Sequence, residues 1–122
     1  MPSNRLIFPK AARLFRVAEF ARLKNEGQSF HGKLIVLSVL RSAGENESRI
    51  GFITSRRVGG AVVRNRVRRR MREIVRTARP QLKAGLWLAL IARQSAARAS
   101  FQALRDEWTL LAQRSSILAA CS

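Results

Sequence analysis

The chain has 122 residues, of which 47% are hydrophobic, so it can form one domain with an apolar core and is not a disordered basic tail. Its 24 Lys and Arg against 7 Asp and Glu give a net charge of +17. Such a charge repels itself, and a polyanion such as nucleic acid offsets the repulsion, with an anionic membrane surface as the alternative.

The N-terminal quarter is predicted to hold an irregular arm, one helix and a short strand. Residues 1–12 form the basic arm, because Pro9 disfavours a helix there. A helix is expected over residues 17–26, followed by Gly27 at a C-terminal cap position. A weak pattern indicates a strand over residues 29–32.

Two longer strands are predicted next. Residues 33–41 are rich in Leu, Ile and Val, and residues 42–48 are polar and typical of a turn. Residues 49–56 alternate in character, with Ile50 and Phe52 on one side. We expect the two strands to form an antiparallel hairpin.

The Gly59-Gly60 step interrupts the strand pattern and precedes a predicted helix over residues 61–78, which ends before Pro80. Its apolar residues recur at helical spacing and define one stripe, made of Val63, Val67, Met71, Ile74, Val75 and Ala78.

A strand and a helix complete the predicted fold. The unbroken apolar run over residues 86–92 indicates a strand that is buried on both faces. Ser100 is a candidate N-cap for a helix over residues 100–113. The residues expected on its core side are Phe101, Leu104, Trp108 and Leu111. We therefore expect a single α+β domain over residues 1–122, with helices packed on a small sheet and a frayed end over residues 115–122.

No segment is predicted to enter a membrane. The apolar run over residues 86–92 is far shorter than the roughly 20 residues that span a bilayer, and no apolar signal region follows the first residues. We therefore expect a cytoplasmic protein without a membrane partner.

The helix over residues 61–78 carries the strongest functional signal. Between Arg56 and Arg79 the chain has many Arg residues and one acid, Glu73. At about 100° per residue, one side opposite the apolar stripe collects Asn65, Arg68, Arg69, Arg72 and Arg76, while Arg64 and Arg70 flank the stripe. A solvated face is the alternative, but such faces usually mix charge signs. A face of one sign, without local charge partners, is expected to displace counterions from a phosphate backbone.

The remaining candidate residues carry weaker signals. Stacking on bases is a hypothesis for Phe20, Phe30, His31 and Phe52, with core packing as the alternative. Cys121 is the single cysteine and His31 the single histidine, and no paired-carboxylate or phosphate-loop pattern occurs. We therefore expect no catalytic residue, no metal site on the protein and no small-molecule substrate.

The stretch from Arg49 to Glu73 resembles the signature of the bacterial ribonuclease P protein family. It contains a glycine-bearing strand, the step Ser55-Arg56-Arg57, and then Gly-x-Ala-Val-x-Arg-Asn-Arg from Gly59 to Arg66. Arg13-Leu14 with Glu19-Phe20, and the stretch 90–97, also resemble this family, so that the similarity covers about residues 4 to 118.

The resemblance implies a small basic cofactor of a catalytic RNA. The family's holoenzyme is an endoribonuclease that cleaves the 5′ leader from precursor transfer RNA and leaves a 5′-phosphate. The RNA and the Mg²⁺ ions held by RNA and substrate perform the chemistry, and one protein monomer binds one RNA. The implied fold runs α-β-β-β-α-β-α, like the second domain of ribosomal protein S-five, with a left-handed β-α-β crossover.

The same resemblance implies two binding regions. The face toward the catalytic RNA would comprise Arg56, Arg57, Arg64, Asn65, Arg66, Arg68, Arg69, Arg72 and Arg76. A cleft between the first helix and the sheet would hold the single-stranded leader, with Phe20, Arg16 and Lys24 at its wall. Lys24 departs from the family pattern, which often has a second aromatic there, and Ser38 lies near a frequent Tyr position.

Two other functions compete with this interpretation. A structural or ribosome-associated RNA-binding protein without a processing role would share the charge and the fold class, but the spacing of Arg64-Asn65-Arg66 favours the ribonuclease P family. A DNA-binding regulator is disfavoured, because a strand rather than a helix is predicted before the basic helix.

Overall fold

The computed structural model describes residues 17–41, 49–83 and 85–117, and for residues 17–20 the backbone alone. The predicted arm over residues 1–12, the turn over residues 42–48 and the segment 118–122 lie outside the described residues. The elements in chain order are α2 (Val17–Glu26), β1 (Gln28–His31), β2 (Ile35–Arg41), β3 (Arg49–Ile53), α3 (Ala61–Ala78), β4 (Leu86–Ala92) and α4 (Phe101–Ser115). Short 3-10 turns lie at η2 (Arg56–Val58), η3 (Arg79–Gln81) and η4 (Gln94–Arg98).

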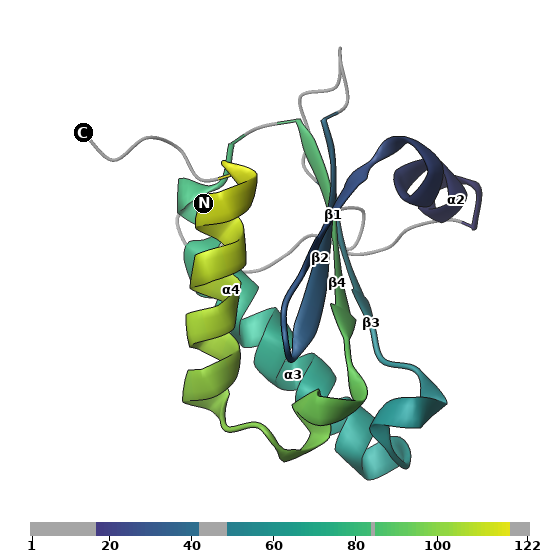
Figure 1. Ribbon diagram of the computed structural model, residues 1–122, viewed down its shortest axis with the longest axis vertical. Helices are drawn as coiled ribbons and strands as arrows, with labels where there is room; N and C mark the ends of the chain where they lie inside the picture. The colour runs from purple at the N-terminus through teal and green to yellow at the C-terminus, as the bar shows by residue number, and fades with distance from the viewer. Residues whose placement is uncertain (1–16, 42–48, 84, 118–122) are drawn as a thin grey trace, which may run out of the picture.

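The molecule has three layers, with the sheet in the middle. Helices α3 and α4 cover one face of the sheet and α2 covers the other (Figure 1). This arrangement confirms the expected α+β fold class. None of the helices in the described segments is long and apolar enough to cross a membrane.

The strand order is β1-β2-β4-β3, which contradicts the predicted hairpin between residues 33–41 and 49–56. β4 lies between these two strands, antiparallel to β2 and parallel to β3. The antiparallel hairpin is instead formed by β1 and β2, so the weakly marked strand near residues 29–32 is confirmed. The prediction failed because the most apolar strand takes the centre of the sheet, whatever its place along the chain.

β3 and β4 are parallel neighbours connected through α3, so the expected β-α-β crossover is present. Its left-handed sense and the likeness to ribosomal protein S-five stay predictions.

β3 is shorter than predicted. It ends at Ile53 instead of residue 56, and the chain turns at η2. Val58, in this turn, is 4% exposed and joins the core. The turn therefore takes the chain from the edge of the sheet to the start of α3.

The main core lies between the sheet and the helices α3 and α4. From α3 it receives Val67, Met71, Ile74 and Val75, while Val63 and Ala78 are partly buried, which confirms the predicted stripe. From α4 it receives Leu104, Trp108 and Leu111. Phe101 was expected on this side but is 37% exposed, because it stands in the first turn of α4 beyond the edge of the core.

The Ser100 cap is confirmed, since its Oγ accepts a hydrogen bond from the Ala103 amide at 3.1 Å.

A smaller core covers the other face of the sheet. Leu23 of α2 is 1% exposed and packs with Leu40, Trp87 and Ala89. Because alternate residues of β4 enter opposite cores, the strand is buried on both faces, as its apolar run predicted.

The carboxylate of Glu107 ties α4 to the turn between β1 and β2. Its oxygens accept hydrogen bonds from the amides of Lys33 at 2.9 Å, Leu34 at 2.6 Å and Ile35 at 2.7 Å. Gly32 permits this approach, because a Cβ at that position would lie 2.5 Å from the carboxylate. The sequence pattern did not reveal this contact, since its partners are backbone groups of a remote segment.

We predict that Glu107→Ala lowers the free energy of unfolding by about 2 kcal/mol, because partly buried amides lose their acceptor. Asp106→Ala is the matched control: it removes the same charge from the preceding position, where the carboxylate accepts an exposed hydrogen bond from Gln102. Urea unfolding of both variants measures the difference. Equal losses of stability would show that the three amides gain nothing from Glu107.

Candidate nucleic-acid interface

A tight turn places Arg56 and Arg57 beside the start of α3. Gly59 has a φ of 151°, which L side chains rarely adopt, and a Cβ there would lie 3.0 Å from Val63. Arg56 and Arg57 are exposed, whereas Val58 between them and Gly59 is buried. Buried Val58 and the glycine turn therefore hold two cations next to the first turn of the helix.

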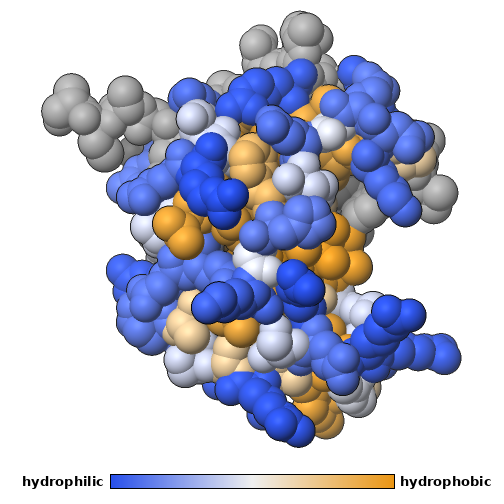
Figure 2. Space-filling model, in the orientation of Figure 1, coloured by the Kyte–Doolittle hydropathy of each residue, from blue (hydrophilic) through white to orange (hydrophobic). Residues whose placement is uncertain are grey.

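The polar side of α3 points away from the core. Because Val67, Met71, Ile74 and Val75 face the sheet, the helical period directs Asn65 and Arg69 outward, and both are exposed. Hydrophilic side chains cover most of the molecular face drawn in Figure 2, with apolar patches between them. The predicted division of α3 into an apolar side and an Arg/Asn side is thus confirmed.

One flank of this polar side is anchored to β3 and to the residue that follows it. Arg68 donates to Thr54 Oγ1 at 2.7 Å and to Asn65 Oδ1 at 3.1 Å. Arg72 lies over the ring of Phe52, 5.9 Å from its centroid. These contacts hold two guanidinium groups in place, which lowers the entropy that binding would cost.

The opposite flank is anchored to the segment after β4. Arg66 donates to the carbonyl of Ala97 at 3.1 Å, and Arg70 donates to the carbonyl of Ala99 at 2.8 Å. On α3, the predicted site residues therefore lie on two flanks and on the exposed strip between them, here called the crest, which carries Asn65 and Arg69. Half-buried Arg64 has an Nε atom that is buried and lacks a hydrogen-bond partner among the described residues, which is a costly state for a donor.

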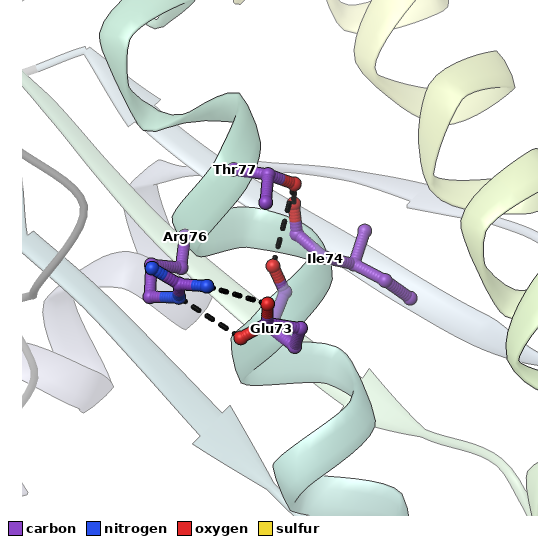
Figure 3. Close-up of polar contacts among 4 residues, drawn as sticks. All are labelled: Glu73, Ile74, Arg76 and Thr77. Carbon is purple, nitrogen blue, oxygen red and sulfur yellow. Dashed lines mark hydrogen bonds and ion pairs between the residues drawn. The ribbon is translucent and has the colours of Figure 1, made fainter.

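Arg76 has a charge partner, contrary to the expectation that the polar side lacks one. Its Nε and Nη2 atoms donate to the carboxylate of Glu73 at 2.9 and 2.5 Å (Figure 3). This hydrogen bonding lowers the pKa of Glu73 and raises the pKa of Arg76. An i, i+3 pair is within reach on a helix, so the sequence contained the signal for it.

The aromatic candidates for base stacking take different places. Phe30 and Phe52 are partly buried and pack against the main core, as the alternative interpretation predicted. His31 is exposed at the end of β1. Phe20 belongs to α2, but its side chain lies outside the described residues.

The residues predicted to line a leader cleft are described in part. Arg16 lies outside the described residues, and Lys24 is exposed on α2. Arg22 of α2 and Arg49 of β3 lie over the indole of Trp87, at 5.3 and 5.5 Å from its ring centroid. The sequence interpretation missed this cluster, although Trp87 falls on the strand face opposite Leu88 and Leu90, where α2 packs.

The described part of the chain holds no candidate metal site. No three His, Cys, Asp or Glu side chains there are grouped so that they would hold an ion.

Comparisons with known proteins point to one family. The family model described as Ribonuclease P matches residues 8–116. A protein from Chloroflexus aurantiacus named ribonuclease P protein component is 41% identical over 112 residues, which cover 91% of this chain and 82% of the relative. A relative of the same name from Symbiobacterium thermophilum is 37% identical and covers 89% of this chain and 95% of its own length.

Solved structures show the same fold. The RNase P protein from Thermotoga maritima has a TM-score of 0.73 at 27% identity, over 83% of this chain and 96% of that one. The RNase P protein of Staphylococcus aureus has a TM-score of 0.82 at 24% identity, over 89% of this chain and 99% of that one.

Proposed function

The chain belongs to the ribonuclease P protein family, and we propose that it binds the catalytic RNA of that enzyme through the polar side of α3. It is the RNA-binding protein subunit of ribonuclease P, an endoribonuclease that acts in transfer RNA processing. The family match disfavours a structural or ribosome-associated protein without a processing role.

The observation that carries the proposal is the exposed crest of α3. Asn65 and Arg69 are exposed on it, and the nearest acid along the helix, Glu73, is paired with Arg76. Arg68 and Arg72 are held on one flank and Arg66 on the other. Guanidinium groups that are already oriented bind phosphate oxygens at low entropic cost, and Asn65 adds an amide that donates and accepts. Arg56, Arg57 and Arg64 extend this surface at the start of the helix.

The chemistry belongs to the RNA in this proposal. The protein supplies no catalytic residue, and the Mg²⁺ ions are held by the catalytic RNA and the precursor transfer RNA. One protein monomer binds one RNA, and the complex works in the cytoplasm. Arg76 contributes less charge to the surface than its neighbours, because Glu73 pairs with it.

We predict that Arg69→Ala with Arg72→Ala weakens binding to the catalytic RNA and reduces the slope of log affinity against log salt by about two, or roughly one per phosphate contact. Filter binding over a salt series measures both quantities. Arg105→Ala with Arg114→Ala is the matched control, since both residues are exposed on α4 and the net charge falls equally.

An unchanged slope in the Arg69/Arg72 variant would mean that another surface meets the RNA. A loss equal to that of the α4 control would mean that net charge alone matters.

We further propose that the leader of the precursor passes along the junction of α2 with the sheet, where the family resemblance implies contacts with Phe20, Arg16 and Lys24. The two guanidinium groups over Trp87 support this, because Arg49 adds a cation at the same junction. Arg22 adds less charge there, since it is paired with Glu26 at 3.3 Å. Both residues extend the cleft beyond the side chains that the family resemblance implies.

Phe20→Ala tests the leader proposal. We expect the reconstituted holoenzyme to bind precursor transfer RNA about tenfold more weakly, because one base loses its stacking partner, and to bind mature transfer RNA as before. Lys24→Gln should change the salt dependence of precursor binding instead. Equal losses for precursor and mature RNA would contradict a contact with the leader.

A further inference from the structure

Besides the polar side of α3, the molecule has a basic hollow at one end of the sheet, where η2 and η4 meet the turn between β1 and β2. This hollow is here called the end groove. The segments η2 and η4, which line it, lie toward the lower end of the molecule in Figure 1. It has a volume of about 960 Å³, and its charged lining residues are Lys33, Arg57, Arg93 and Arg98. Among the described residues that line it, none is acidic.

The walls of the end groove are fixed by hydrogen bonds. Arg93 donates from Nη1 to the carbonyl of Gly32 at 2.8 Å, and Ser95 donates from its hydroxyl to the carbonyl of Lys33 at 2.6 Å. The amide of Arg93 also donates to the carbonyl of Leu34 at 2.8 Å. With the Glu107 carboxylate on the other side of the turn, these bonds hold the backbone of Lys33 against the segment after β4.

Two carboxylates line a neighbouring hollow that shares Lys33 and Arg93 with the end groove. Asp106 and Glu107 line that hollow and not the end groove. Three backbone amides fix the Glu107 carboxylate at the turn, and its side chain lines the neighbouring hollow rather than the end groove. Lys33, Arg57 and Arg98 are exposed, and their mutual repulsion favours an anion between them.

We propose that the end groove binds a phosphodiester segment of the catalytic RNA, as a second contact beyond the polar side of α3. The hollow is open and surrounded by several separate cations, which suits consecutive phosphates better than one small anion. Ser95 and Gln94 add hydroxyl and amide groups to the lining. This inference rests on the proposed function of the chain.

The catalytic RNA is favoured because the groove continues the surface of α3. Arg57 lines the groove and lies in η2, directly before the helix. Arg66 and Arg70 bind the carbonyls of Ala97 and Ala99, on either side of Arg98. The wall of the end groove is therefore attached to α3. A single RNA molecule that lies across the polar side of α3 also reaches the end groove.

Lys33→Gln with Arg98→Gln tests the groove. Both side chains are exposed, whereas Arg57 belongs to the proposed α3 surface and Arg93 supports the turn. The control is Arg105→Gln with Arg114→Gln, which removes two charges from α4 outside the groove. We expect the groove variant to lower the salt slope for the catalytic RNA by about two and the control to leave it nearly unchanged.

Comparison with the Arg69/Arg72 variant, and binding of precursor transfer RNA, separate the possible outcomes. If the groove variant behaves like its control while the Arg69/Arg72 variant loses slope, the groove inference is wrong and the proposed function stands. If neither variant loses slope, both the groove inference and the proposed binding of the catalytic RNA through α3 are wrong. A loss confined to precursor transfer RNA, measured with the reconstituted holoenzyme, would overturn the assignment to the catalytic RNA and place the substrate in the groove.

Discussion

The burial of β4 on both faces is the constraint on which the rest of the structure depends. Its side chains enter the main core on one face and pack under α2 on the other, so the strand must lie inside the sheet. With β2 antiparallel on one side and β3 parallel on the other, the chain has to cross from β3 to β4 through α3. That crossing packs the apolar stripe of α3 on the sheet and leaves its Arg/Asn side outside.

The charge of the chain is arranged around this frame. The cations are held by uncharged partners in several places: Arg68 by the Thr54 hydroxyl, Arg66 and Arg70 by backbone carbonyls. Such partners orient a guanidinium group without cancelling its charge, so an approaching phosphate meets an ordered and still positive surface. The Arg76–Glu73 pair is the exception on α3, because there the charge is largely compensated. In the proposed function the protein thus contributes oriented charge to the RNA that it binds.

The sequence was sufficient to predict elements whose periodicity is local. The bounds of α2, α3 and β4 were predicted correctly, because hydrophobic spacing, a Gly-Gly step and an unbroken apolar run mark them. The pairing of β2 with β4 was not predictable from periodicity, since strand order depends on which strand is buried most. For the candidate site, the outward residues Asn65 and Arg69 followed from helix geometry, whereas the anchors of Arg66 and Arg68 lie in segments brought close by the fold. Lys33, Arg93 and Arg98 were missed for the same reason.

Cleavage of a precursor transfer RNA at low Mg²⁺ tests the central claim most directly. The rate is measured with a bacterial ribonuclease P RNA alone and after addition of this chain. We expect faster removal of the 5′ leader at the same site when the protein is present, because its cations offset repulsion between the two RNAs. No gain over the RNA alone, with the protein folded and present in excess, would contradict the assignment of this chain as the working protein subunit.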